Sequence, residues 1–275
     1  MHVLVTGGAG YIGSFMVKRL LADNHQVTVV DSLERGHEEA IDGRSTFRKG
    51  NLGDDAFLQE LFQHNSFDAI IHFAAYISIG ESMKDPFMYF ENNTYNALKL
   101  LEIANKYNVK KIIFSSTAGV YGNPVNTPIP EDHPKNPENP YGESKLMVEK
   151  MLSWYQQIHG LNFVVLRYFN ACGAALDGSM GEAHEPESHI IPNIINAVLE
   201  EKPFTLFGGD YKTPDGTCIR DYIHVLDLVE AHMLALNKLE HDQGGYFYNV
   251  GTGKGYSNNE IVAVVKKVAG IDFEV

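Results

Sequence analysis

Cysteine and basic residues are scarce in this sequence, and each shortage excludes a class of protein. The 275 residues include two cysteines, Cys172 and Cys218, and no CxxC pair, which rules out a disulfide framework and a cysteine-based zinc site. We expect both cysteines to be small buried hydrophobic residues. Lys and Arg number 22 against 35 Asp and Glu, which gives a net charge of −13. A surface this acidic repels phosphate backbones and anionic lipids, so we expect no nucleic-acid partner and no membrane partner.

Long hydrophobic segments are also missing. The longest apolar stretch, residues 69–79, is too short to cross a bilayer and is interrupted by a histidine. No secretion signal precedes the strand-like residues 2–6, so we expect a cytoplasmic protein. The overall length is enough for one large domain or two modest ones, each with its own core.

The 12 histidines form no recognisable set of metal ligands. His184, His189 and His224 are too scattered along the sequence to predict a metal site, so no metal is expected. His72 lies within an apolar strand-like segment, and we expect it to be a core residue.

Strand-like and helix-like segments alternate through the first 170 residues. Strands are predicted at 2–6, 26–30, 47–49, 68–73, 111–116 and 163–167, and helices at 11–23, 54–63, 93–107 and 141–159. This alternation predicts an α/β fold with a doubly wound parallel sheet. We therefore expect a dinucleotide-binding domain at 1–170. A smaller substrate-binding domain is expected at 171–275, with segments that can interleave with the first.

The last part of the chain predicts one more helix. Ser257 and Glu260 form a capping box, and Gly270 can end the helix. The expected buried face consists of Ile261, Val264, Val265 and Val268. Residues 271–275 look like the beginning of a strand, so the second domain is expected to be incomplete.

The first glycine cluster predicts a dinucleotide site. Gly7, Gly10 and Gly13 follow a strand and open a helix, as G-x-x-G-x-x-G. Gly7 permits a tight turn, Gly10 lets the backbone approach a pyrophosphate, and Gly13 allows close packing of helix and strand. Asp31 ends the second strand, where it can accept hydrogen bonds from the adenosine ribose and repel a 2′-phosphate. This combination favours NAD over NADP.

Tyr141 and Lys145 are four residues apart at the start of a predicted helix, so both face the same side. A phenol with a pKa of about 10 is a poor base at neutral pH, and lowering it by about three units requires about 4 kcal/mol. One ammonium at roughly 6 Å contributes about 2.8 kcal/mol at an effective dielectric of ~20. We expect the positive nicotinamide ring of oxidised NAD to supply the remainder, and Thr117 to bond the substrate hydroxyl.

Longer segments resemble a known superfamily. TGGAGYIG, IIHFAA, FSSTAGVYG, PYGESK and RYFN are similar to the extended short-chain dehydrogenase/reductases, which share the Rossmann fold. Residues 213–228, TPDGTCIRDYIHVLDL, resemble more specifically the UDP-glucose 4-epimerase family. The resemblance implies an NAD-dependent isomerase that interconverts UDP-glucose and UDP-galactose by transient oxidation at carbon 4. Dehydratases of the superfamily carry an acid after the active-site Ser or Thr, whereas this chain has Ala118 and Gly119.

The resemblance also implies site residues. The expected catalytic residues are Thr117, Tyr141 and Lys145. The expected contacts with NAD are Gly7, Gly10, Tyr11, Ile12, Gly13, Asp31, Asn51, Leu52, Phe73, Ala74, Asn92, Tyr141, Lys145 and Phe169. The expected contacts with the UDP-hexose are Thr117, Tyr141, Asn170, His189 and Arg220. A homodimer is implied, formed through the helices near 93–107 and 141–159.

Some alternatives stay open at this point. Arg220 is expected to meet the diphosphate, but a structural ion pair with Asp221 or Asp227 is the other interpretation. Family chains continue past Val275 with an Ala-Pro-Arg-Arg-x-Gly-Asp-like segment, so the activity of the 275-residue form is left open. The alternative functions are a 4-epimerase of N-acetylated or uronate UDP-sugars and an NAD-binding protein without catalytic activity.

Overall fold

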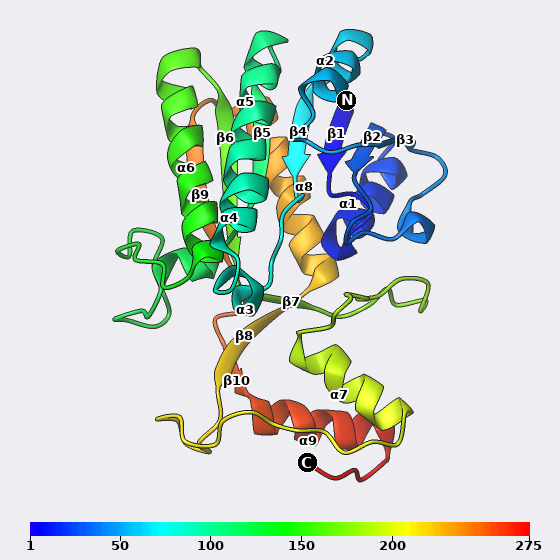
Figure 1. Cartoon of the computed structure of the whole chain (residues 1–275), viewed down its shortest axis with the longest axis vertical. Helices are drawn as coiled ribbons and strands as arrows, with labels where there is room; N and C mark the ends of the chain where they lie inside the picture. The colour runs from blue at the N-terminus through cyan, green and yellow to red at the C-terminus, as the bar shows by residue number, and fades with distance from the viewer.

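The computed structural model describes residues 1–275 and contains one large and one small sheet (Figure 1). The large sheet is parallel throughout and has seven strands in the order β3-β2-β1-β4-β5-β6-β9. Its strands are β1 (His2–Thr6), β2 (Gln26–Asp31), β3 (Thr46–Lys49), β4 (Ala69–His72), β5 (Lys111–Thr117), β6 (Asn162–Tyr168) and β9 (Gly245–Val250). The predicted doubly wound sheet is confirmed.

Helices cover both faces of this sheet. They are α1 (Tyr11–Ala22), α2 (Asp55–His64), α5 (Asn96–Lys106), α6 (Pro140–His159) and α8 (Val225–His241). One core cluster joins α2, α5 and α6 to the sheet, and a second joins α1 and α8. None of the helices combines the length and the apolar character needed to cross a membrane.

Short helical segments connect the main elements. They are η1 (Glu38–Ala40), α3 (Ile79–Ser82), α4 (Pro86–Tyr89), the π-helical η2 (Phe90–Tyr95) and η3 (Ala118–Tyr121). The helix predicted at 93–107 is thus divided between η2 and α5. Asn93 lies in η2, is 2% exposed, and hydrogen-bonds both backbone groups of Tyr76 at 2.8 and 2.9 Å. A buried amide tied in this way connects η2 to the loop after β4.

The second part of the molecule is built around a sheet of three short strands. β7 (Asn170–Cys172), β8 (Ile219–His224) and β10 (Gly255–Ser257) lie in the order β10-β8-β7. Two helices, α7 (Ile190–Leu199) and α9 (Asn258–Ala269), contact one another below it (Figure 1). Between these segments the chain returns to the large sheet as α8 and β9.

The C-terminal predictions are confirmed only in part. The capping box of Ser257 is present, and α9 ends at Gly270 in the left-handed conformation. The buried face is wrong, because Val264 is 55% and Val268 is 81% exposed, whereas Val262 is buried. The strand at 271–275 is also wrong, since the only backbone hydrogen bond recorded there joins Phe204 N to Glu274 O, and one bond makes no ladder. The helical period predicts an apolar face on α9, but it does not predict whether another part of the chain covers that face.

A buried ion pair fixes α6 to the sheet. Arg167 on β6 and Glu149 on α6 have side chains that are 1% and 2% exposed, and Arg167 donates two hydrogen bonds to Glu149 at 2.6 and 2.9 Å. Ser116 on β5 donates to the same carboxylate at 2.6 Å. The third turn of α6 is therefore held against the carboxyl ends of β5 and β6.

Replacing one member of this pair should destabilise the protein strongly. Glu149→Gln leaves the guanidinium of Arg167 buried without a counter-charge, so we expect the free energy of unfolding to fall by about 3–5 kcal/mol. Urea unfolding followed by circular dichroism measures the change. The control is Glu240→Gln on the exposed side of α8, which should stay within about 0.5 kcal/mol of the wild type. Equal stability of the two variants would contradict the proposed role of the pair.

Candidate functional site

The turn between β1 and α1 requires glycine at two positions. Gly7 has a φ of +75°, and a Cβ there would lie 2.5 Å from the backbone N of Ala74. A Cβ on Gly13 would lie 2.1 Å from the carbonyl O of Gly7. No side chain can be accommodated at either position without moving backbone, so the tight turn and the close helix packing predicted for these glycines are both present.

The same turn forms a cradle suited to a phosphate group. Gly10 is the N-cap of α1 and supplies no side chain to the free N–H groups of the first turn, which contains no acid. A Cβ on Gly10 would meet only the carbonyl O of Gly7, at 3.4 Å, so the approach to the helix N-terminus is open. Free N–H groups and the positive end of the helix dipole favour an anion here, which fits a dinucleotide pyrophosphate.

Asp31 lies beside this cradle at the end of β2. Its Oδ2 accepts a hydrogen bond from Ala9 N at 3.0 Å, and its Oδ1 accepts one from Leu33 N at 2.9 Å. These bonds fix the carboxylate next to the glycine turn while leaving further lone pairs to accept ribose hydroxyls. The structure thus brings together the glycines and the acid that the sequence singled out.

Other predicted cofactor residues lie around the turn. The backbone N–H groups of Phe73 and Ala74 both donate to Thr6 O, at 2.9 and 3.1 Å, which places them directly after β4 at the same edge of the sheet. Tyr11 donates its hydroxyl to Gly173 O at 2.6 Å and thereby ties the turn to the loop after β7. Phe169 follows β6, and its ring would lie 3.0 Å from a Cβ on Gly251.

The side chains of the remaining predicted cofactor residues pack in the core or form hydrogen bonds within the chain. Leu52 is 7% exposed, and its side chain belongs to the hydrophobic core. Asn51 accepts a bond from Gly53 N at 2.7 Å, and Asn92 donates to Asn93 Oδ1 at 3.1 Å. Ile12 packs partly against the second core cluster. A role of these residues toward a cofactor stays a prediction.

Tyr141 and Lys145 lie in the first two turns of α6, beside the end of β5. Asn139 is the N-cap and accepts a hydrogen bond from Gly142 N at 2.8 Å, which fixes the start of the helix. Lys145 is 3% exposed, and its Nζ donates to Ser115 O at 2.9 Å. Thr117 ends β5, with its Oγ1 accepting from Gly119 N at 3.0 Å. Two hydroxyls and one amine therefore meet at the carboxyl edge of the sheet.

Burial dominates the electrostatics of this group. It raises the pKa of Tyr141 to about 12, and the hydrogen bond with Thr117 opposes that rise. Burial also lowers the pKa of Lys145 to about 7. The contribution of about 2.8 kcal/mol expected from Lys145 presumes a charged amine, whereas a lysine with so low a pKa is only partly charged at neutral pH. A phenolate here needs further positive charge.

The predicted substrate residues lie on the second part of the molecule. Asn170 starts β7 and donates to Asp221 O at 2.8 Å. Arg220 on β8 is exposed and donates only to Ile219 O, at 3.0 Å. The alternative ion pair is not formed, because Asp221 accepts instead from the backbone N–H groups of residues 252 and 253, and Asp227 is exposed and unpaired. The guanidinium of Arg220 is therefore free to meet an anion.

The histidines are arranged differently from the expectation. His72 is a core residue, as predicted, and its Nδ1 bonds Thr6 Oγ1 at 2.7 Å. His184 and His189, however, are not scattered, since their ring centroids lie 5.2 Å apart. Two glutamates that sequence reasoning missed, Glu182 and Glu187, complete the group. The spacing E-x-H-x-x-E-x-H at 182–189 was the available signal.

The chain is similar in sequence and in structure to known epimerases. Residues 3–251 match the family model described as NAD dependent epimerase/dehydratase family. The UDP-glucose 4-epimerase of Lacticaseibacillus casei is 48% identical over 271 residues, which cover 98% of this chain and 82% of the relative. Probable UDP-arabinose 4-epimerase 3 of Arabidopsis thaliana is 44% identical over 288 residues, which cover 100% of this chain and 70% of the relative. The UDP-glucose 4-epimerase structure from Bifidobacterium longum with NAD+ and UDP matches with a TM-score of 0.93 and 38% identity, covering 100% and 85%.

The low pKa of Lys145 predicts a pH-dependent stability. The unfolded chain holds a proton on this lysine up to its usual value of 10.5, whereas the folded chain releases it near 7. Between these values the unfolded state binds more protons, so the free energy of unfolding rises with pH by up to about 1.4 kcal/mol per unit.

Lys145→Met removes this dependence. Urea unfolding at several pH values, without added dinucleotide, should show a smaller rise for the variant than for the wild type. The control is Lys150→Met, an exposed lysine on the same helix, which should keep the wild-type slope. Identical slopes for Lys145→Met and wild type would contradict the low pKa.

Proposed function

This chain belongs to the NAD dependent epimerase/dehydratase family, and we propose that it interconverts UDP-glucose and UDP-galactose by transient oxidation at carbon 4 of the hexose. Its enzyme class is therefore an NAD-dependent isomerase. The observation that carries the proposal is the meeting of Tyr141, Thr117 and Lys145 beside a dinucleotide cradle, at one edge of the sheet. The similarity to UDP-glucose 4-epimerases over nearly the whole chain supports it.

The residues around the glycine turn suit the cofactor. Gly7, Gly10 and Gly13 leave room for a pyrophosphate at the start of α1, and Asp31 is fixed to receive ribose hydroxyls. NAD, when bound, accepts the hydride of carbon 4 and returns it. Because the hydride is returned, the cofactor is not consumed in the overall reaction.

The proton chemistry belongs to the chain itself. We assign Tyr141 the removal of the proton from the 4-hydroxyl and its later return. Thr117 lies close enough to the phenol to lower its pKa, and its hydroxyl can bond the same substrate hydroxyl. Lys145, held by Ser115 O at 2.9 Å, lies one helical turn from Tyr141 and changes its charge close to neutral pH.

The residues that follow Thr117 favour epimerisation over dehydration. Ala118 and Gly119 form the start of η3 and carry no acid or base. Removal of water from the sugar would need a second proton donor at this position, which the chain does not provide there. The substrate side of the proposal uses Asn170, His189 and the unpaired Arg220, with Arg220 meeting the diphosphate.

An assay with UDP-galactose and NAD tests this function. We expect the wild-type protein to form UDP-glucose, and Tyr141→Phe to lose activity by about 10²–10⁴-fold while still binding NAD, because only the proton-transfer group is removed. The control is Tyr155→Phe on the same helix, whose hydroxyl bonds Glu102 on the exposed surface.

The outcomes separate the alternatives. Turnover of an N-acetylated or uronate UDP-sugar, without turnover of UDP-galactose, would replace the proposed substrate. Binding of NAD without binding of UDP in calorimetry would indicate a non-catalytic NAD-binding protein. Wild-type activity in Tyr141→Phe would remove the tyrosine from the base role.

We also propose that two copies of the chain associate through α6 and the α5 region. Met147, Trp154 and Ile158 lie on one stripe of α6 and are 37%, 62% and 67% exposed. Tyr95 at the end of η2 and Leu98 in the first turn of α5 are 54% and 37% exposed. Exposed apolar stripes on neighbouring helices are typical of an interface between copies.

Sedimentation analysis tests the dimer. We expect wild type at twice the chain mass of 30.7 kDa, and Trp154→Glu at the mass of one chain, since it places a charge in the proposed interface. The control is Leu234→Glu, because Leu234 is 71% exposed on α8, away from that surface. A wild-type protein that sediments as one chain would exclude this interface.

A cytoplasmic location stays a prediction. Cys172 and Cys218 are both free thiols, which supports a reducing compartment, and both are half-buried instead of fully buried as expected. Cell fractionation tests the location, and recovery of the protein in a membrane fraction would contradict it.

A further inference from the structure

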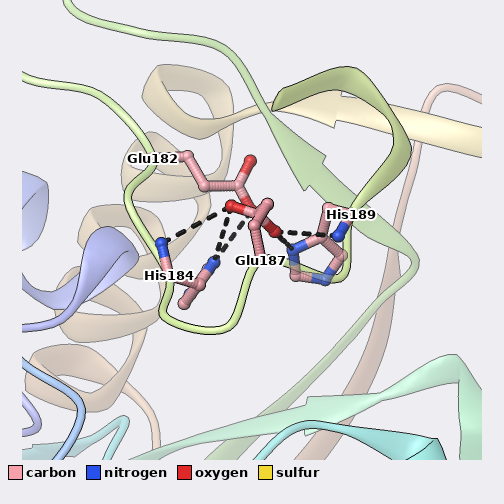
Figure 2. A group of neighbouring side chains, drawn as sticks. All are labelled: Glu182, His184, Glu187 and His189. Atoms are coloured by element: carbon pink, nitrogen blue, oxygen red, sulfur yellow. Dashed lines mark hydrogen bonds and ion pairs between the residues drawn. The ribbon is translucent and has the colours of Figure 1, made fainter. Parts of the chain in front are cut away.

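The loop between β7 and α7 gathers four side chains around one point. Glu182, His184, Glu187 and His189 all turn inward, and each offers one ligand atom within 4.8 Å of the others (Figure 2). None of the four belongs to the proposed proton-transfer group on β5 and α6. The cluster therefore needs an explanation of its own.

The distances within the cluster match those between the ligands of one metal ion. Glu182 Oε1 lies 3.1 Å from His184 Nδ1 and 2.5 Å from His189 Nδ1. The carboxylate of Glu187 lies 3.7 Å from His184 Nδ1 and 3.5 Å from His189 Nδ1. Ligands at 2.0–2.1 Å from a tetrahedral ion are separated by about 3.3 Å, and three of these four distances are close to that value, whereas the contact of Glu182 with His189 is shorter.

Burying these four polar side chains without hydrogen-bond partners or a bound ion costs free energy. The side chains of Glu182 and Glu187 are 7% and 10% exposed. Glu182 Oε1, His184 Nδ1 and His189 Nδ1 are buried, and none of them forms a hydrogen bond of acceptable geometry despite their proximity. Buried polar atoms without partners are rare in native proteins, and three aimed at one point indicate a missing ligand.

The charges indicate a divalent cation. A carboxylate must be ionised and an imidazole neutral to act as metal ligands. Two carboxylates and two neutral imidazoles carry a charge of −2, which a divalent ion balances. Glu187 is oriented by the backbone N–H groups of Ser188 and His189, at 2.7 and 2.8 Å.

We propose that Glu182, His184, Glu187 and His189 bind one divalent transition-metal ion, with Zn²⁺ as the best match. Two imidazole nitrogens exclude Ca²⁺ and Mg²⁺, which require shells made mainly or entirely of oxygen. Mixed nitrogen and carboxylate ligands in a four-coordinate arrangement suit Zn²⁺. The side chain of His189 is 42% exposed, so the ion can reach the site from solvent.

The position of the site predicts a structural role. His37, in the N-terminal part, bonds Ala183 O through its Nε2 at 2.6 Å, and the ring of Tyr11 packs edge-on against His184. At the other end of the loop, His189 is the N-cap of α7. A bound ion would fasten this loop between the dinucleotide cradle and α7, and would leave Nε2 of His189 free.

Metal analysis of the NAD-bound protein, made without a histidine tag and stripped with a chelator, tests the site. After addition of Zn²⁺ and gel filtration, we expect one zinc per chain by mass spectrometry and a higher melting temperature than in the stripped protein. Glu182→Gln and His184→Gln should each weaken zinc binding by more than 100-fold, because loss of an outer contact alone typically costs about 10–100-fold. The control, Glu185→Gln, changes an exposed glutamate of the same loop and should bind zinc like the wild type.

Cobalt substitution tests the geometry independently of stability. Co²⁺ in the wild-type site should show the intense visible bands of a four-coordinate ion, and these bands should be absent from His184→Gln. One equivalent of another transition metal bound through the same residues would support the metal site and change only the identity of the ion. Zinc bound no more tightly by wild type than by His184→Gln would overturn the proposal, and would leave the cluster as ion pairs between glutamates and protonated imidazoles.

Discussion

The candidate site depends on a lysine that is buried without a carboxylate. Lys145 is 3% exposed, and its Nζ contacts the carbonyl O of Ser115 and the face of the Phe114 ring. Desolvation lowers its pKa to about 7, and it raises the pKa of the neighbouring Tyr141 to about 12. A carboxylate beside the lysine would have restored an ordinary ammonium, but it would also have opposed ionisation of the phenol. The chain thus holds an amine and a phenol whose charges depend on what else binds at this edge of the sheet.

Such an arrangement requires rigid support, and the buried ion pair of Glu149 with Arg167 provides it. Glu149 is one turn beyond Lys145 on α6, and it is bound by Arg167 from β6 and by Ser116 from β5. Ser116 precedes Thr117, so the same contacts that hold α6 also fix the strand end that carries the threonine hydroxyl. The position of Tyr141 relative to Thr117 therefore follows from packing between one helix and two strands.

The proposed metal site would extend this rigidity to the substrate side. The segment from residue 173 to 189 contains no helix or strand, and it is attached to the N-terminal part through Tyr11 and His37. Arg220 and Asn170 lie on the small sheet, which the loop joins to α7. Most residues of this loop are exposed or half-buried, so hydrophobic burial contributes little to holding it in place. An ion at Glu182 and His184 would fix the loop in one conformation.

The sequence by itself determined the local elements and the chemistry that each one carries. Alternating apolar runs predicted β1 to β6, because strand and helix periods differ, and the glycine triplet predicted a turn that only glycine can form. The tertiary structure decided what depends on distant contacts. Which residues of α9 are covered, the return of β9 to the large sheet, and the high pKa of Tyr141 all result from burial by segments far away in the chain. The folded backbone also decides that His184 and His189 lie beside two glutamates. Loop residues follow no periodic pattern, so the sequence does not predict which of them are neighbours in space.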